Sequence, residues 1–395
     1  MNEILNARIK KLAHDNEEYV IALRREFHMN PEPAYEEERT SGVIQYELKK
    51  MGIAYEVLED RTVIGVIKGN QGGKTIAIRG DIDALRIQDE KSAPYKSQNA
   101  GIMHACGHDA HGAMLLGIAK MLVELKKDLK GTVKLIFQVA EEVSGGYKTI
   151  LEYLEKTGGV DRVIATHLWA GLDTGMISIE SGPVMAGNHH LHIEVTGCGG
   201  HASRPDQAIN PIFPLCDIIM KLPYVPQYFH NALEASVVSI GTVHAGTTFN
   251  IIPDKAKASG GVRFFTTEAK EAIQGYICNL AEHIAKAYGA EAKVSFPNGI
   301  EPVVNDETSV KLAREVVHAV EGLRLVPYEQ ICASDCYGMI LRKYPGCYCF
   351  MGIRNEEKGI IYPQHHAKYD IDESVMRLNC EFMCKYAVEY LTEQM

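Results

Sequence analysis

The sequence lacks the features that mark membrane, secreted and nucleic-acid-binding proteins. No apolar run reaches the roughly 18 residues that a membrane helix needs. Residues 1–10 mix charged and apolar side chains and lack the apolar core of a signal peptide. The net charge is −10 at pH 7 and no long basic run is present, which argues against a protein that follows nucleic-acid phosphates. We therefore expect a cytoplasmic protein with no membrane and no nucleic-acid partner.

Cysteine is too sparse for a disulfide framework. The chain has 10 cysteines in 395 residues, so we expect reduced thiols, most of them in the core. Four of them could hold a structural zinc ion: Cys332, Cys336, Cys347 and Cys349. Their spacing matches no common zinc motif, and the alternation at Cys347 and Cys349 is typical of a buried strand. Packing is therefore the favoured interpretation.

The order of the predicted elements indicates an α/β protein with two domains. A chain of this length exceeds what a single core usually supports. Helical periodicity predicts a first helix over residues 1–30, and apolar runs predict buried strands over 75–81, 133–139 and 160–165. Residues 189–296 follow a different order, strand–helix–strand–strand–helix–strand, which is typical of a split βαβ module.

We therefore predict a catalytic domain with a mixed, largely parallel sheet flanked by helices, formed by residues 1–184 and 299–395. Residues 185–298 are predicted to form an inserted βαββαβ, ferredoxin-like α/β sandwich. Its edge strands could pair across a twofold axis, which predicts a homodimer.

The most informative segment is residues 103–111, Met-His-Ala-Cys-Gly-His-Asp-Ala-His. It places one thiol, three imidazoles and a carboxylate directly before a predicted helix over 111–127. Thiolates and neutral imidazoles are preferred ligands of borderline-soft divalent metals. Asp81, Glu142 and His167 follow apolar runs, and the carboxyl ends of strands in open α/β sheets are where sites gather.

Five candidate ligands stand in separate loops: Cys106, His108, Glu142, His167 and His365. A single tetrahedral zinc uses at most four protein ligands. Five ligands that include a sulfur able to bridge suit two metals about 3.5–4 Å apart, a geometry used for hydrolysis. Glu141 precedes Glu142, and a carboxylate beside the metals can take a proton from water and return it to a leaving amine. A metal-dependent hydrolase is the favoured function.

Two other function classes stay open at this point. Cys106 could be a nucleophile activated by His104 or His108, which would make the chain a thiol hydrolase. The cluster could also belong to a non-catalytic module that binds a metal or an amino acid. The spare carboxylate of Glu141 argues against a pure binding site, and a cysteine between two histidines favours metal binding over a single Cys–His pair.

Seven segments spread over nearly the whole chain carry recognisable motifs: residues 25–32, 79–85, 103–109, 137–142, 199–205, 250–254 and 365–372. Together they resemble the dinuclear-metal amidohydrolase family of aminoacylases, hippurate hydrolases and auxin-conjugate hydrolases. Cys-Gly-His-Asp combined with Ala-Glu-Glu is the most specific part of the resemblance.

The resemblance implies a role for each candidate residue near the metals. Cys106 would bridge two metal ions, and the other four candidate ligands would complete the set, with His365 rather than His366 as the last. Glu141 would be the general acid/base. Asp81 and Asp83 would orient the ligands from behind, and His104, Asp109 and His111 would have supporting roles.

The resemblance also assigns functions to the inserted block, as a lid and dimerisation domain. His201 would reach the active site, often from the other subunit of a dimer, and stabilise the oxyanion. Asn250 and Arg263 would contact the substrate. The planar guanidinium of Arg263 suits a free carboxylate, and a surface charge paired with a neighbouring acid is the alternative interpretation.

The expected reaction is metal-dependent hydrolysis of the amide bond of an N-acyl amino acid or a small dipeptide-like conjugate. Zinc or manganese, and after them cobalt or nickel, are the expected two ions per subunit. Dipeptidase or carboxypeptidase activity at the same site is the alternative. Trp169, near His167, hints at an apolar wall.

Three departures from the family's pattern concern substrate preference. Arg86 stands where relatives commonly have proline, Cys198 replaces a lysine or arginine, and Ser334-Asp335-Cys336 replaces Glu-Asp-Phe. None of them removes a candidate ligand.

Overall fold

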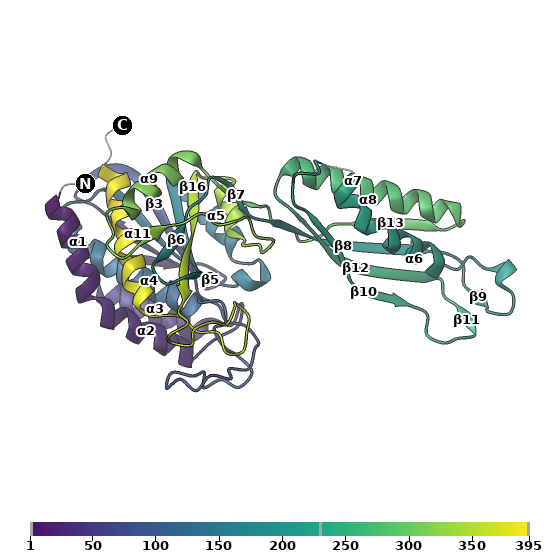
Figure 1. Cartoon of the computed structure of the whole chain (residues 1–395), viewed down its shortest axis with the longest axis horizontal. Helices are drawn as coiled ribbons and strands as arrows, with labels where there is room; N and C mark the ends of the chain where they lie inside the picture. The colour runs from purple at the N-terminus through teal and green to yellow at the C-terminus, as the bar shows by residue number, and fades with distance from the viewer. Residues whose placement is uncertain (1–2, 229–230, 393–395) are drawn as a thin grey trace. The chain divides into compact units, whose positions relative to one another are not determined.

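The computed structural model describes residues 3–228 and 231–392, and the chain forms two compact units (Figure 1). Unit 1 comprises Met1–Gly182, Val304–Glu329 and Met339–Met395. Unit 2 comprises Pro183–Val303 and Gln330–Gly338. Within the described ranges, no helix combines the length and apolar character needed to cross a bilayer.

Unit 1 is built on a mixed sheet. Within the described residues it has eight strands in the order β1-β2-β4-β3-β5-β16-β6-β15. Its centre is parallel, because β3 pairs in parallel with β4 and β5, and β16 pairs in parallel with β5. The strands are β1 (Ala54–Val57), β2 (Val63–Lys68), β3 (Gln71–Asp81), β4 (Lys130–Gln138), β5 (Arg162–Asp173), β6 (Met176–Ser178), β15 (Arg324–Leu325) and β16 (Gly346–Arg354).

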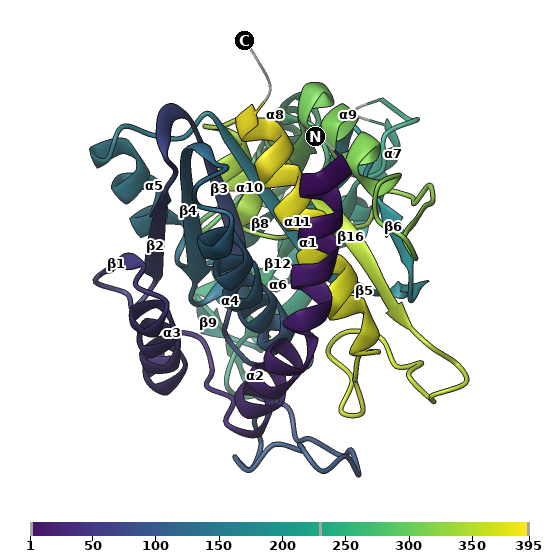
Figure 2. The same cartoon turned by 90° about the vertical axis from the view of Figure 1, so that its left-hand side faces the viewer.

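Helices bury the central strands of this sheet. Helices α4 and α11 pack against β3, and α1 and α2 lie outside them (Figure 2). β4 and β16 are therefore almost continuously buried, as expected of strands covered on both faces. The helices are α1 (Glu3–Asp15), α2 (Glu17–Met29), α3 (Glu38–Lys50), α4 (His108–Glu124), α5 (Tyr147–Lys156), α9 (Glu307–Val317) and α11 (Ser374–Thr392).

Unit 2 contains an antiparallel sheet in the order β10-β12-β8-β13. Helices α6, α7 and α8 lie on one face of it (Figure 1), and alternate residues of β8, Leu191, Ile193 and Val195, point into the core beneath them. The elements are β8 (Gly187–Thr196), β9 (Gly200–His201), α6 (Ile212–Lys221), α7 (Val225–Tyr228), β10 (Val237–Ala245), β11 (Ile251–Ile252), β12 (Lys255–Phe264), α8 (Thr267–Ala287) and β13 (Glu291–Ser295).

The predicted fold class is confirmed. A mixed, largely parallel sheet with helices is interrupted by a βαββαβ module whose strand order is that of a ferredoxin-like sandwich. Three short elements lie where the chain passes between the units: β7 (Gly182–Met185), β14 (Val303–Asn305) and α10 (Tyr337–Leu341).

Several predicted elements differ in their bounds. The helix expected over residues 111–127 is α4, which begins at His108 and ends at Glu124. The helix expected over residues 1–30 is two helices that meet at Asn16, whose side-chain amide donates to the Leu12 carbonyl at 2.8 Å. The Asn16 backbone amide also keeps its helical hydrogen bond to the Leu12 carbonyl, at 3.1 Å, so the interruption is a single residue with φ −100° and ψ −2°. Met1 and Asn2 lie outside the described residues. The strand expected over 160–165 continues to Asp173, because β16 goes on pairing with β5 beyond His167.

The close approach of α4 to α2 provides a test of the packing. A Cβ atom added at Gly117 in α4 would lie 2.5 Å from Val20 Cγ2 and 3.2 Å from Cys380 Sγ. We expect Gly117→Ala to lower the free energy of unfolding by about 1–3 kcal/mol through overpacking, measured by urea unfolding. The control is Gly42→Ala in α3, where no atom lies within 4 Å. Alanine favours a helix there, so a loss of stability equal to that of Gly117→Ala would contradict the packing account.

Candidate metal centre

The carboxyl ends of the parallel strands of unit 1 bring the predicted ligands together. β3 ends at Asp81, and β4 is followed by a 3-10 turn, η1 (Glu141–Val143). β3 pairs with β5 only as far as Arg79 and Ala165. His167 therefore lies just beyond the shared edge of the two strands, although it is still within β5.

A left-handed glycine separates the first two candidate ligands. Gly107 has φ 95° and ψ 9° and caps α4, which begins at His108. A Cβ atom at this position would lie 2.9 Å from the Tyr369 hydroxyl oxygen. Only glycine adopts this conformation without cost in so little space, and the turn allows the side chains of Cys106 and His108 to converge.

Five donor side chains form one connected cluster. The donor atoms of Cys106, His108 and His167 lie within 4.8 Å of one another, as do those of Cys106, Glu142 and His365. Cys106 Sγ lies 3.5 Å from His167 Nε2. The two oxygens of Glu142 lie 3.9 Å from His108 Nε2 and 3.4 Å from His365 Nε2.

The outer nitrogens of two histidines are held by hydrogen bonds, which turns their Nε2 lone pairs inward. His108 Nδ1 donates to Asp83 Oδ1 at 3.0 Å, and His167 Nδ1 donates to the Leu168 carbonyl at 2.7 Å. Among the described residues, buried His108 Nε2 and Glu142 Oε1 have no hydrogen-bond partner. Inward lone pairs with hydrogen-bonded outer nitrogens are the usual arrangement of metal-binding histidines, so this donor set fits a divalent cation.

The charges around the cluster favour a cation. Burial lowers the pKa of His108, but Asp81 and Asp83 outweigh it and raise that pKa well above its ordinary value. Burial also raises the pKa of the Cys106 thiol, and the charge of Glu142 acts in the same direction. The carboxylates thus stabilise positive charge at the centre of the site, which a metal ion would supply.

His365 has unusual backbone geometry. Its φ is 64°, in the left-handed region, and its amide donates to the Ala105 carbonyl at 2.7 Å. Its side chain is 54% exposed. The adjacent His366 instead stacks on Tyr362, with ring centroids 4.4 Å apart.

His111 uses both ring nitrogens in hydrogen bonds, and His104 belongs to none of the groups of donor atoms close enough to hold an ion among the described residues. His111 Nδ1 hydrogen-bonds to Asp81 Oδ1, and its Nε2 accepts from the Leu168 amide at 3.0 Å, so both ring nitrogens are used. Burial lowers the pKa of His104 to about 3. Asp109 forms a buried ion pair with Arg24 at 2.9 Å.

Glu141 lies beside the ligand cluster on the same short turn as Glu142. One of its carboxylate oxygens is within 4.8 Å of donor atoms of His108 and Glu142. Ala140 and Ser144, on either side of the turn, both have left-handed backbones, with φ 58° and 57°. This geometry places two consecutive carboxylates at one centre.

The two aspartates after β3 contact different parts of the site. Asp83 Oδ2 accepts from the Glu142 amide at 3.0 Å, while its other oxygen holds His108. Asp81 forms a buried ion pair with Arg79 at 2.6 Å and lies 3.7 Å from His108 Nε2.

The remaining predicted site residues lie in unit 2. His201 in β9 pairs with Ile251 in β11, and the Asn250 carbonyl accepts from the Ala202 amide at 3.2 Å, which places His201 and Asn250 side by side. His201 Nδ1 accepts a hydrogen bond from the Ser203 amide at 3.1 Å.

Arg263 in β12 is half-buried and donates to Ser334 Oγ at 2.8 Å. This partner is a hydroxyl group, whereas the alternative interpretation expected a neighbouring acid. Burial lowers the pKa of Arg263. Of the other departures, Arg86 pairs with exposed Glu36, and Cys198 is exposed.

An aromatic group adjoins His167, and a small cavity lies near His111. Trp169 Nε1 donates to the Tyr328 hydroxyl at 2.8 Å, and its ring lies 5.2 Å from that of Phe350.

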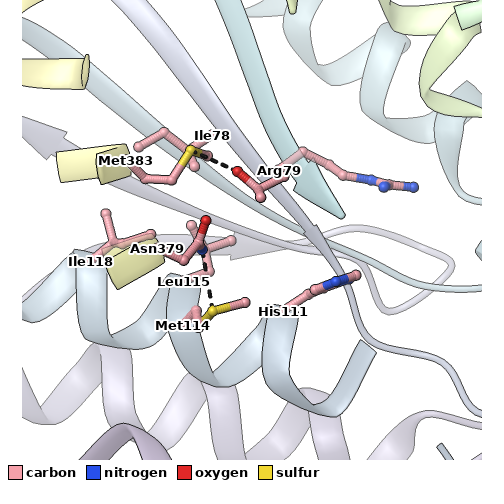
Figure 3. A pocket seen from close by; sticks show the side chains of 9 residues that line it. Ile78, Arg79, His111, Met114, Leu115, Ile118, Asn379 and Met383 are labelled. Atoms are coloured by element: carbon pink, nitrogen blue, oxygen red, sulfur yellow. Dashed lines mark hydrogen bonds between the residues drawn. The ribbon is translucent and has the colours of Figure 1, made fainter. Parts of the chain in front are cut away.

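The cavity near His111 has a volume of about 10 Å³, enough for a single water at most. Figure 3 shows the side chains that line it. Its lining includes Met114 and Met383, whose sulfurs accept hydrogen bonds from Asn379 and Thr166. It is too small for a substrate.

Sequence reasoning missed Glu37, which contacts the turn that carries Glu141 and Glu142. Glu37 Oε1 accepts from the Ala140 amide at 2.7 Å. Glu37 stands in the acidic run Glu36–Glu38, which is typical of an exposed helix start, so composition gave no signal of burial.

Comparisons with known proteins support one family. The profile described as "Peptidase family M20/M25/M40" matches residues 77–389. Thermostable carboxypeptidase 2 of Saccharolobus solfataricus is 36% identical, over 97% of this chain and 98% of the relative. An N-acetylcysteine deacetylase of Bacillus subtilis is also 36% identical, over 93% of this chain and 96% of the relative.

A solved structure agrees with this result. A dinuclear metal binding peptidase of the M20 family from Bacillus subtilis superposes with a TM-score of 0.85 at 33% identity, covering 96% of this chain and 99% of that one. Sequence profile, full-length relatives and fold thus agree, and the chain belongs to peptidase family M20/M25/M40.

Proposed function

We propose that this chain hydrolyses the amide bond of N-acyl amino acids, using two divalent metal ions held by Cys106, His108, Glu142, His167 and His365. The observation that carries the proposal is the cluster of five donor side chains with Glu141 beside it. The deacetylase and the dinuclear metal binding peptidase among the similar proteins support the reaction class and the number of ions. Zinc or manganese suits the mixed S, N and O donors, with cobalt or nickel next.

The bound ions would polarise the scissile carbonyl and lower the pKa of a water molecule. Glu141 takes the proton of the attacking water and delivers it to the departing nitrogen. Asp83 and Asp81 hold the surrounding groups in place. His201 is proposed to stabilise the oxyanion, and the acceptor role of its Nδ1 supports this, because it leaves the ring proton on Nε2.

Asn250 and Arg263 are proposed to bind the substrate, with Arg263 at its free carboxylate. The aromatic group at Trp169 suits an apolar acyl chain. A carboxypeptidase or dipeptidase is the second candidate, since a carboxypeptidase is as similar to this chain as the deacetylase is. N-acetyl, N-benzoyl and indoleacetyl amino acids assayed beside dipeptides distinguish the two. Metal binding without turnover of any of them would indicate a non-catalytic module.

We further propose that residues 1–184 and 299–395 act as the catalytic domain and that residues 185–298 act as a lid and dimerisation domain. β10 is an edge strand of the four-stranded sheet of unit 2 and exposes apolar side chains, with Val243 51% exposed. An exposed apolar edge favours pairing with a second strand, which supports a homodimer.

Replacing the proposed acid/base and the proposed bridging ligand should separate chemistry from metal binding. We expect Glu141→Gln to keep its metal and lose turnover by at least about a hundredfold, because the amide cannot carry the proton. Cys106→Ala should lose metal as well as activity. The measurements are metal content, by mass spectrometry, and kcat, and together they separate loss of metal from loss of chemistry. Undiminished turnover in Glu141→Gln would remove it as the base, and full metal content with activity in Cys106→Ala would refute a bridging sulfur.

Alkylation of the metal-free protein tests the thiol-hydrolase alternative. Cys106 is 8% exposed and burial raises its pKa, so we expect iodoacetamide to modify it later than exposed Cys198. Peptide mass spectrometry gives the rate at each cysteine, and the exposed Cys216, Cys278 and Cys332 serve as internal controls. Rapid modification of Cys106, with activity that resists chelators, would favour a thiol nucleophile instead.

A further inference from the structure

A buried carboxyl group fastens the turn that carries Glu141 and Glu142. Glu37 has 0% exposure, whereas its neighbours Glu36 and Glu38 are exposed. It directly precedes α3, and its Oε1 accepts from the Ala140 amide at 2.7 Å across 103 residues of sequence. Such a group costs free energy to bury, so its position calls for an explanation.

The turn that Glu37 contacts has a backbone that needs support. Ala140 and Ser144 have left-handed φ values of 58° and 57°, which are unfavourable for residues with a Cβ atom. The Ala140 carbonyl accepts from the Gly145 amide at 2.7 Å, and the Glu142 amide donates to Asp83. Strained backbone persists where the surroundings hold it and is concentrated at functional sites.

The segment that carries Glu37 is itself held firmly. Glu32 accepts hydrogen bonds from the amides of Arg39 and Thr40 at 2.9 and 2.7 Å, which ties the segment to the first turn of α3. A Cβ atom at Gly145 would lie 2.3 Å from the Tyr35 hydroxyl oxygen, so the segment and the turn are in direct contact. Glu37 thus provides a fixed acceptor for the Ala140 amide.

We propose that Glu37 is a positioning residue, which fixes Ala140 and thereby aims the carboxylates of Glu141 and Glu142. The inference rests on the proposed roles of those two residues. Glu37 does so through its hydrogen bond to Ala140 and not through its charge. The charges that act on its carboxyl group are those of Asp83 and Glu32, which are also negative and would not stabilise a further negative charge.

The surroundings favour the neutral acid. Burial and, less strongly, Asp83 and Glu32 raise the pKa of Glu37 to about 8, against the lowering effect of the amides of Glu37 and Ala140. Among the described residues, buried Oε2 of Glu37 has no hydrogen-bond partner. An ionised oxygen would be costly there, and glutamine should replace the neutral acid well.

Three variants test the proposal: Glu37→Ala, Glu37→Gln and the control Glu36→Ala. Glu36 is the exposed neighbour and pairs with Arg86 on the surface. We expect Glu37→Ala to lower kcat 10- to 100-fold with little change in KM, and to weaken metal binding about tenfold in competition with a chelator, as typical for groups that orient ligands. Hydrogen exchange in residues 138–146 should become faster. Glu37→Gln should retain most of the activity, and Glu36→Ala all of it.

Stability against pH tests the charge state. A raised carboxyl pKa means that the folded protein loses stability as pH rises from about 4.5, the unfolded value, to about 8. Glutamine cannot ionise, so Glu37→Gln should not lose this stability. As pH rises over this range, the melting temperature of Glu37→Gln minus that of wild type should increase. The same difference for Glu36→Gln should stay constant. Parallel curves of melting temperature against pH for wild type, Glu37→Gln and Glu36→Gln would overturn the claim that Glu37 is a neutral acid.

The positioning role has its own contradicting results. A Glu37→Ala protein with a lower melting temperature but unchanged kcat, metal affinity and exchange at 138–146 would show that Glu37 only stabilises the fold. Equal damage in Glu37→Gln and Glu37→Ala would show that the hydrogen bond is not the cause. If wild type binds metal but cleaves no substrate, the proposed function fails. The metal affinity of Glu37→Ala and its hydrogen exchange in residues 138–146 still test the positioning role in that case.

Discussion

Asp83 joins the parts of the candidate metal centre. It is 1% exposed, and its two oxygens accept from His108 Nδ1 and from the Glu142 amide, each at 3.0 Å. One carboxylate therefore sets the tautomer of a histidine at the start of α4 and the position of the turn after β4. Both partners donate to this buried carboxylate, and acidic oxygens held in this way favour a cation at the centre.

The polar groups around Asp83 are also held by hydrogen bonds and ion pairs. Asp81 is held by Arg79 and His111, and His111 in turn accepts from the Leu168 amide beside His167. Buried charges are costly unless they are paired, and Asp81, Asp83 and His111 each contact groups on more than one element. On this account the site is rigid because its supports come from β3, α4, β4 and β5 together, and Glu37 adds a support from the start of α3.

Sequence patterns predicted the parts of the fold and site that depend on local signals. The βαββαβ order and the buried strands follow from periodicity, and Cys106, His108 and the Glu141–Glu142 pair are conspicuous by residue type. The missed features depend on contacts between distant residues. Glu37 meets Ala140 across 103 residues, Arg263 meets Ser334 across 71, and β5 extends past His167 only because β16 pairs with it. The helix break at Asn16 is one residue long and leaves the helical backbone bonds of Asn16 and Val20 in place, so apolar periodicity does not reveal it.

The central claim is that the donor cluster holds two metal ions that serve amide hydrolysis. The most direct measurement is the rate of N-acyl amino acid hydrolysis as zinc or manganese is added back to chelator-treated protein, with bound metal counted in parallel. The account predicts no turnover without metal and activity that saturates as about two ions bind per chain. Full turnover in the metal-free protein, or saturation with metal without cleavage of any acyl amino acid or dipeptide, would contradict it.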